Sequence, residues 1–184
     1  MRKNFGAKPF LYPQPVFIIA TYNDDGTADA MNAAWGGVSD SNQITMCISA
    51  THRTTKNVLT RGAFTVSMGT ADTVAACDYV GLVSGEKEPA KLYKAGFHAV
   101  KSEFVDAPLI AELPMAVECR LVSFDPESCR MVGEIVNVCA EEGVLTDGKV
   151  DPAKLRPITF DGQNNTYLVL GEKVGDAFSD GLHL

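Results

Sequence analysis

The chain lacks the signatures of several common protein classes. It contains neither a G-x-x-x-x-G-K-[ST] loop nor a G-x-G-x-x-G loop, which disfavours a P-loop nucleotidase and a Rossmann dehydrogenase. No apolar run follows the early cations Arg2 and Lys3, so we expect no signal peptide, and no run is as long as a membrane span. Basic residues are few, at 16 against 23 acidic ones, and the net charge of −7 argues against nucleic acid and anionic membranes as partners.

Paired cysteines and metal-ligand spacings are missing as well. The five cysteines form no C-x-x-C pair, so we expect buried free thiols in a reducing, cytoplasmic protein. Cys77 has no second cysteine nearby in sequence to resolve a disulfide, which favours a structural thiol. The three histidines, His52, His98 and His183, lack ligand spacing, and we predict no metal site.

What the chain does contain suits one domain spanning residues 1–184. Alternating or continuous apolar runs predict strands at 16–22, 27–35, 44–49, 63–68, 115–124, 129–141 and 166–170, and Gly36-Gly37 is expected to break the second strand. Helical spacing predicts short helices at 54–61, 71–83 and 90–95, the last ending at Gly96. Residues 1–14 and 171–184 are predicted to be extended, and 147–157 to be a loop with a short turn. This order favours a mainly β, antiparallel barrel over a parallel sheet.

The stretch from Gln43 to Arg61 changes character from a buried strand to a polar joint and then to a helix. We expect a Ser/Thr-type cap at the helix start, with hydroxyls and the cations Arg53 and Lys56 close by. Unpaired amides and the helix dipole favour an anion such as phosphate at such a place. The competing interpretation is an ordinary strand–loop–helix joint with solvated cations, and the local pattern leaves both open.

A set of motifs in a fixed order resembles the flavin reductase-like family, in its flavoredoxin branch. The residues that carry the resemblance are Tyr22, Gly26, Asn32-Ala33-Ala34-Trp35, Ile48-Ser49-Ala50-Thr51, Arg53-Thr54-Thr55-Lys56-Asn57, Cys77 to Gly85, Lys91, Gly96-Phe97, Ala107 to Ile110, Val117 to Cys119, and Gly133 to Val136. The resemblance covers nearly the whole chain. It implies an FMN-binding split β-barrel and a homodimer with non-covalent FMN near the interface.

The resemblance also implies which residues contact FMN. Asn32, Ala33, Ala34 and Trp35 would run along the isoalloxazine ring, and Ser49, Ala50 and Thr51 would lie beside the ring and the ribityl chain. Arg53, Thr54, Thr55, Lys56 and Asn57 would bind the phosphate, and Ser84, Gly85 and Lys91 would approach from the following loop. For Trp35, the only tryptophan, the alternative role is a core or dimer-contact aromatic. Asp78 and Tyr79 are interpreted as packing and capping groups, and His52 as a surface loop residue.

Three functions follow from this resemblance as hypotheses. The first is an oxidoreductase in which NAD(P)H reduces bound FMN, which then reduces free flavin, a ferric complex or another acceptor. The second is a non-enzymatic electron carrier between proteins, and the third is a barrel that binds no flavin and acts as a binding module. Because the cofactor carries the chemistry, no catalytic residue is predicted. The hydroxyl and cation run at 49–57 argues against the third hypothesis.

Overall fold

The computed structural model describes residues 1–183, in which β-strands predominate. The strands are β1 Phe17–Tyr22, β2 Ala28–Ala33, β3 Gly36–Asp40, β4 Gln43–Cys47, β5 Ala63–Met68, β6 Ala99–Lys101, β7 Pro108–Ile110, β8 Met115–Asp125, β9 Arg130–Ala140, β10 Leu145–Thr146, β11 Lys149–Val150, β12 Ile158–Asp161 and β13 Thr166–Val169. The helices are α1 Arg53–Arg61, α2 Val74–Leu82, α3 Lys91–Ala95 and α4 Pro152–Leu155, with 3₁₀ turns at Ala71–Thr73, Glu142–Val144 and Asp180–His183. Leu184, the end of the predicted tail, lies outside the described residues.

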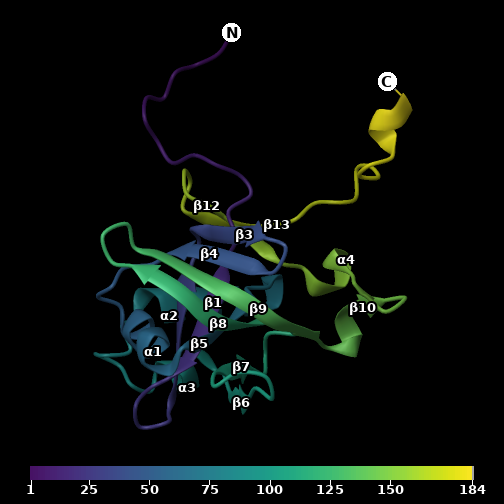
Figure 1. The fold of residues 1–184 in the computed structure, drawn as a ribbon. Coiled ribbons are helices and arrows are strands. Elements are labelled where there is room, and N and C mark those ends of the chain that lie inside the picture. Colours follow the sequence, from purple (N-terminus) through teal and green to yellow (C-terminus); the bar gives the residue numbers. More distant parts are fainter. Residues whose placement is uncertain (184) are drawn as a thin grey trace.

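Seven strands form one curled antiparallel sheet in the order β2-β1-β5-β8-β9-β4-β3 (Figure 1). Its two outermost strands, β2 and β3, are consecutive in sequence and are joined only by Ala34 and Trp35. The chain therefore passes directly from one edge of the sheet to the other, which curls the sheet into a split barrel. The predicted mainly β, antiparallel barrel is confirmed.

Strand β1 shows why the interior forms. Phe17 and Ile19 pack with Phe64 and other buried side chains in one apolar cluster, while Ile18 and Ala20 belong to a second cluster that includes residues of α2 and α3. Because successive side chains point to opposite faces of a strand, β1 is buried on both sides, which explains its continuous apolar sequence. Each fully buried side chain of this size contributes about 1.5–3 kcal/mol. Helices α2 and α3 are thereby fixed against β2.

The predicted elements agree with the structure to within a few residues, with the following corrections. Gly36 and Gly37 begin β3 rather than only ending the preceding strand, and the break falls at Ala34 and Trp35. A Cβ at Gly36 would lie 2.8 Å from the carbonyl oxygen of Thr45, so glycine permits the close approach of β3 to β4. The tail predicted to be extended contains a 3₁₀ turn at Asp180–His183, and the short strands β3, β6, β7, β10, β11 and β12 were not predicted. Their apolar alternation is too brief to stand out in the sequence.

The thiols are free, but not all are buried. Cys77 and Cys119 are buried, Cys129 and Cys139 are partly exposed, and Cys47 is exposed. The expectation of burial was wrong for Cys47 because this residue ends β4 with its Sγ near the carbonyl oxygen of Ser128 at the surface. Burial raises the pKa of the Cys119 thiol to about 12, which makes it a poor nucleophile.

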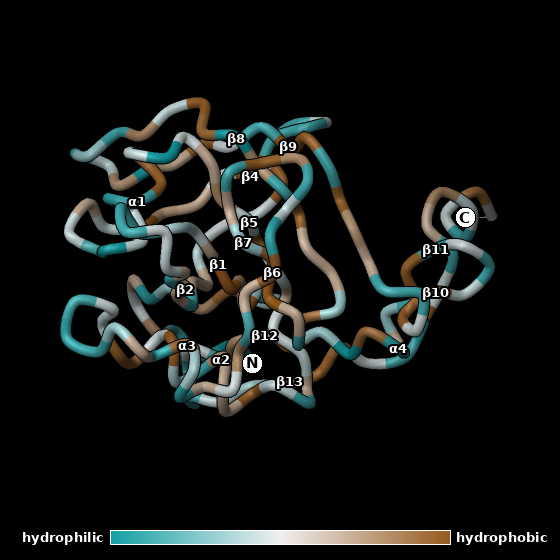
Figure 2. The backbone as a smooth tube through the Cα atoms, turned by 90° about the horizontal axis from the view of Figure 1, so that it is seen from below, coloured by the Kyte–Doolittle hydropathy of each residue, from teal (hydrophilic) through white to brown (hydrophobic). Residues whose placement is uncertain are grey.

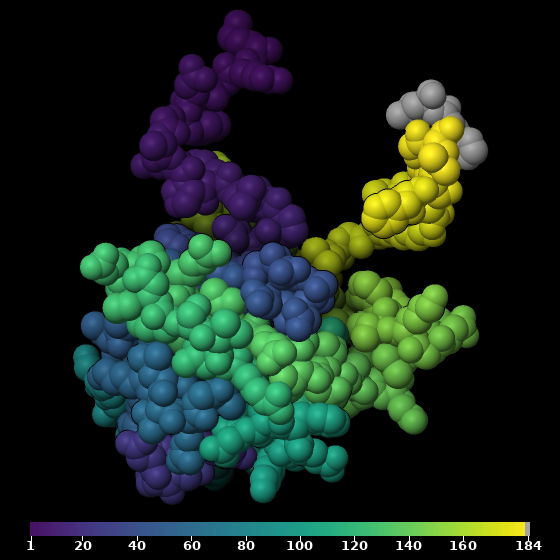
Figure 3. All heavy atoms as spheres, viewed as in Figure 1, coloured from purple at the N-terminus to yellow at the C-terminus, as the bar shows by residue number. Residues whose placement is uncertain are grey.

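The two ends of the chain project from the same side of the barrel (Figures 1 and 3). The N-terminal arm, residues 1–15, is anchored near its end: the amide of Gln14 donates to Thr159 Oγ1 at 2.9 Å, and the Tyr12 hydroxyl donates to Asp161. Figure 2 shows α4, β10 and β11 at one side of the barrel and α1, α2 and α3 at the other. Within the described residues, none of the helices has the length and apolarity needed to cross a membrane.

Candidate functional site

A groove with a polar and an apolar half runs between β2 and α2. The polar half has a volume of about 300 Å³ and includes Arg53, Thr54, Ser84, Gly85 and Lys91 in its lining. The apolar half has a volume of about 210 Å³ and is lined by Asn32, Ala33, Ala34, Asp78, Gly81, Leu82, Phe160 and Tyr167. Asn32, Gly81 and Leu82 line both halves, so the two halves adjoin at these residues.

Helix α1 presents an uncapped N-terminus to the polar half. The residue before it, His52, has extended backbone angles but makes no capping hydrogen bond with its side chain, and the first turn holds no acidic residue. The predicted Ser/Thr-type cap was therefore wrong. The nearby hydroxyls bond elsewhere: Thr54 Oγ1 donates to Asp29 Oδ2 at 2.6 Å, and Thr55 Oγ1 donates to the carbonyl oxygen of Ser49 at 2.8 Å. The first amides of α1 thus remain available to an anion.

Arg53 is the cation fixed closest to this helix start. Its Nε donates to Asn23 Oδ1 at 2.7 Å, and its Nη1 donates to the carbonyl oxygen of Gly85 at 2.9 Å. Within the described residues, Nη2 makes no hydrogen bond. Two of its three nitrogens therefore hold the guanidinium in place, and the third can donate to a ligand.

A buried ion pair underlies the polar half. Lys91 Nζ lies 3.0 Å from Asp29 Oδ1, and the two side chains are 4% and 3% exposed. A Cβ at Gly85 would lie only 2.4 Å from the same Asp29 oxygen, so a glycine is needed where the loop after α2 crosses this pair. Since Asp29 neutralises Lys91, the unbalanced positive charge of the polar half comes from Arg53.

Two further polar residues of α1, Lys56 and Asn57, lie outside the lining of the groove. Lys56 Nζ pairs with Glu86 Oε1 at 2.6 Å on the surface, which lowers the pKa of the Glu86 carboxyl. Asn57 Nδ2 donates to Asn23 Oδ1 at 2.7 Å in the interior. In the structure as described, both side chains therefore bond within the protein.

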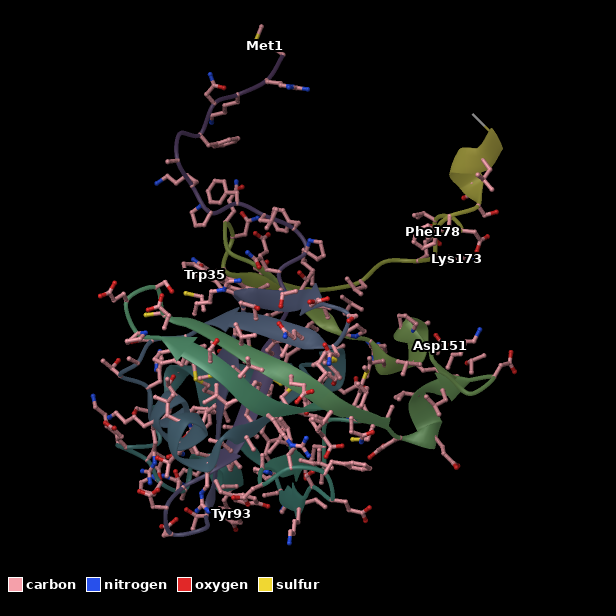
Figure 4. The ribbon with its side chains drawn as sticks, viewed as in Figure 1. Met1, Trp35, Tyr93, Asp151, Lys173 and Phe178 are labelled. Carbon is pink, nitrogen blue, oxygen red and sulfur yellow. The ribbon has the colours of Figure 1, made fainter. Side chains whose placement is uncertain are left out.

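The structure brings together eight of the fifteen residues predicted to contact a cofactor. Those that line the groove are Asn32, Ala33, Ala34, Arg53, Thr54, Ser84, Gly85 and Lys91; those outside its lining are Trp35, Ser49, Ala50, Thr51, Thr55, Lys56 and Asn57. Trp35 is 56% exposed and faces the N-terminal arm (Figure 4). It is therefore no core residue.

Sequence reasoning missed five residues of the apolar half: Asp78, Gly81, Leu82, Phe160 and Tyr167. Phe160 and Tyr167 come from the paired strands β12 and β13, with ring centroids 5.9 Å apart. Asp78 was interpreted only as a packing or capping group, yet it lines the groove and accepts a hydrogen bond from the Tyr167 hydroxyl at 2.7 Å. The available signal was one charged residue within the otherwise uncharged sequence of α2. Nothing in the sequence, however, placed residues 160 and 167 beside it.

The curled antiparallel barrel and its groove define a split-barrel protein of the flavin reductase type. A model of the flavin reductase like domain matches residues 10–157, and the chain therefore belongs to the flavin reductase-like family. Among solved structures, the flavoredoxin of Desulfovibrio vulgaris (Miyazaki F) is 36% identical, with a TM-score of 0.94 and coverage of 98% of this chain and 100% of that one.

A second flavoredoxin agrees with this assignment, and a protein of undescribed activity is similar in sequence. The flavoredoxin from Methanosarcina acetivorans is 29% identical, with a TM-score of 0.86 and coverage of 98% of this chain and 96% of that one. An uncharacterized protein of Aquifex aeolicus (strain VF5) is 28% identical over an alignment of 159 positions that covers 79% of this chain and 79% of that one. The resemblance to the flavoredoxin branch is confirmed.

Proposed function

We propose that the protein binds FMN non-covalently in the groove and transfers electrons through it. The observation that carries the proposal is a groove whose polar half, with an uncapped helix start and a fixed guanidinium, adjoins an apolar, aromatic-lined half. FMN has the same division, with a dianionic phosphate at one end and a flat aromatic ring at the other.

The residues present fit this cofactor. The first amides of α1 and Nη2 of Arg53 would hold the phosphate, because charge-assisted bonds at a helix start stabilise an anion. The ring would lie along Asn32, Ala33 and Ala34, with Phe160 and Tyr167 nearby. The volumes of the two halves, about 300 and 210 Å³, suit a small-molecule cofactor.

The bound flavin would supply the redox chemistry, and the chain's own residues would bind it, orient it and shape its electrostatic surroundings. We therefore assign no catalytic residue. The function we favour is an oxidoreductase in which NAD(P)H is the reductant and a small molecule or a redox protein is the acceptor. Transfer between stacked rings needs no dinucleotide-binding fold for NAD(P)H.

The second candidate is a carrier that moves electrons between proteins without turnover of a nicotinamide. The likeness to two flavoredoxins favours it, since one of them covers this chain almost end to end. Both candidates need bound FMN, and they differ only in the electron donor.

One anaerobic experiment tests the proposal and separates the candidates. Purified protein is loaded with FMN, NADH or NADPH is added, and the visible absorption of the flavin is followed. Bleaching within seconds supports the oxidoreductase. Failure to bleach with either nicotinamide, together with rapid reoxidation of dithionite-reduced protein by a redox protein, supports the carrier. Protein that binds no flavin in the presence of excess FMN refutes both candidates.

A further inference from the structure

We propose that Asp78, oriented by Tyr167, lowers the reduction potential of the flavin bound in the groove. This inference rests on the proposed FMN binding and assigns a role to two residues beyond it. Asp78 acts on the flavin through its charge and takes no part in the bonds that change, and Tyr167, which acts through Asp78, is the positioning residue.

Asp78 brings a negative charge to an otherwise uncharged wall. Among the described residues, it is the one acidic or basic side chain that lines the apolar half, and the residues around it include Ala33, Ala34, Leu82 and Phe160. Within the described residues, it forms no salt bridge. The buried cation Lys91 is paired with Asp29 in the other half of the groove. The charge of Asp78 is therefore not cancelled locally.

Tyr167 determines where that charge lies. Its hydroxyl donates to Asp78 Oδ1 at 2.7 Å, and its strand is held against β12 by the pairing of Tyr167 with Phe160. Burial, together with the hydrogen bond to Asp78, raises the pKa of Tyr167 to about 12. The phenol thus stays protonated at neutral pH, remains a donor, and orients the carboxylate without neutralising it.

The effect on the flavin follows from Coulomb's law. Two-electron reduction with uptake of one proton adds one negative charge to the ring. A carboxylate beside the ring raises the free energy of that reduced form more than that of the neutral oxidised form, and a partly buried site weakens the screening. Asp78 therefore disfavours reduced flavin and makes the bound cofactor a stronger reductant.

The test compares Asp78→Asn with the control Asp40→Asn in FMN-loaded protein. Asparagine keeps the size of Asp78 and can still accept the Tyr167 hydrogen bond, so the fold is preserved. Asp40 is an exposed aspartate at the end of β3 and lines neither half of the groove. Each protein is reduced anaerobically with dithionite against a reference dye, and the potential is read from the two absorption spectra.

We expect Asp78→Asn to favour reduced over oxidised flavin by about tenfold, a rise of ~30 mV for a two-electron couple. The control should keep the wild-type potential. In a Tyr167→Phe background the carboxylate loses its orientation, so the same Asp78→Asn step should shift the potential by less than half as much.

Equal potentials in Asp78→Asn and wild type, with FMN bound to both, would overturn the inference and leave the proposed function standing. A full shift in the Tyr167→Phe background would overturn the role of Tyr167. Wild-type protein that fails to bind FMN would remove the proposed function, and the inference with it.

Discussion

Arg53 is the residue whose environment best distinguishes a binding group from a solvated surface cation. A free surface arginine loses side-chain entropy when it binds, whereas the hydrogen bonds to Asn23 and Gly85 already order this one. The guanidinium therefore loses its conformational entropy when the protein folds. An anion that binds later does not have to offset that loss. Lys56, which pairs with Glu86 at the surface, lacks this advantage.

We predict that Arg53→Ala weakens FMN binding by about 1.5–3 kcal/mol, the range for hydrogen bonds to charged groups. The measurement is a dissociation constant from quenching of flavin fluorescence. Riboflavin, which lacks the phosphate, should bind wild type and variant alike, which separates loss of a phosphate contact from a distorted groove. Arg120→Ala, at an exposed position on β8, is the matched control. An unchanged FMN constant in Arg53→Ala would remove this residue from the site.

Two features of the loop after α2 explain why the groove keeps its shape. Lys91 and Asp29 form a buried ion pair. Removal of either partner would leave the other charge buried and unpaired, which typically lowers the free energy of unfolding by about 3–5 kcal/mol. Gly85 crosses that pair at a distance that excludes any side chain. These residues therefore act on the ligand indirectly, through the position of the loop.

At the scale of elements, helix α1 leaves its own start incomplete. His52 has φ −65° and ψ 141°, the extended geometry in which an N-cap side chain reaches the amides of the first turn, yet its side chain makes no such bond. Unpaired amides at its start make the helix less stable, and an anion that binds there restores that stability. This is the pattern expected of a binding element rather than of a purely structural one.

His52→Asn tests that trade-off. The new amide oxygen should cap α1 and raise the free energy of unfolding by about 0.5–2 kcal/mol, measured by urea denaturation without ligand. The same oxygen should compete with the phosphate and weaken FMN binding by about tenfold, because one hydrogen bond to a charged group contributes ~1.5 kcal/mol. Riboflavin binding should not change. A variant that is more stable and binds FMN equally well would show that the helix start does not contact the phosphate.

At the scale of the whole molecule, the projecting arms suggest a second copy of the chain. Phe5, Phe10 and Leu11 on the N-terminal arm are exposed, as is Trp35 next to it (Figure 4). On the C-terminal tail, Val174 and Phe178 are exposed as well. Apolar side chains gathered on projecting segments are typical of surfaces that become buried on association. We therefore propose a homodimer in which the N-terminal arm packs against the partner.

Deletion of residues 2–11 should weaken that dimer by at least about tenfold, since each large apolar side chain removed contributes ~1.5–3 kcal/mol when buried. Sedimentation velocity over a range of concentrations measures the change. Deletion of residues 2–4 removes only polar side chains and is the control. A wild-type protein that sediments as a monomer, or a longer deletion that leaves the dimer intact, would refute the role of the arm.

The sequence by itself determined six of the seven strands of the barrel sheet, all but β3, and the polar joint before α1. Both follow from local chemistry: an apolar run such as Phe17 to Ala20 predicts a buried strand, and cations beside a helix start predict an anion site. Motif order then predicted the family, which the comparison confirms.

Only the tertiary structure decided which polar groups are left free for a ligand. In the sequence, Thr54, Thr55 and Asn57 are as plausible phosphate ligands as Arg53. In the structure, their side chains form hydrogen bonds within the protein instead. It also brings Tyr167 to Asp78 across 89 positions of the chain. The physical reason is that a hydrogen-bonding group serves whichever partner the fold places within reach, and for these groups that partner is distant in sequence.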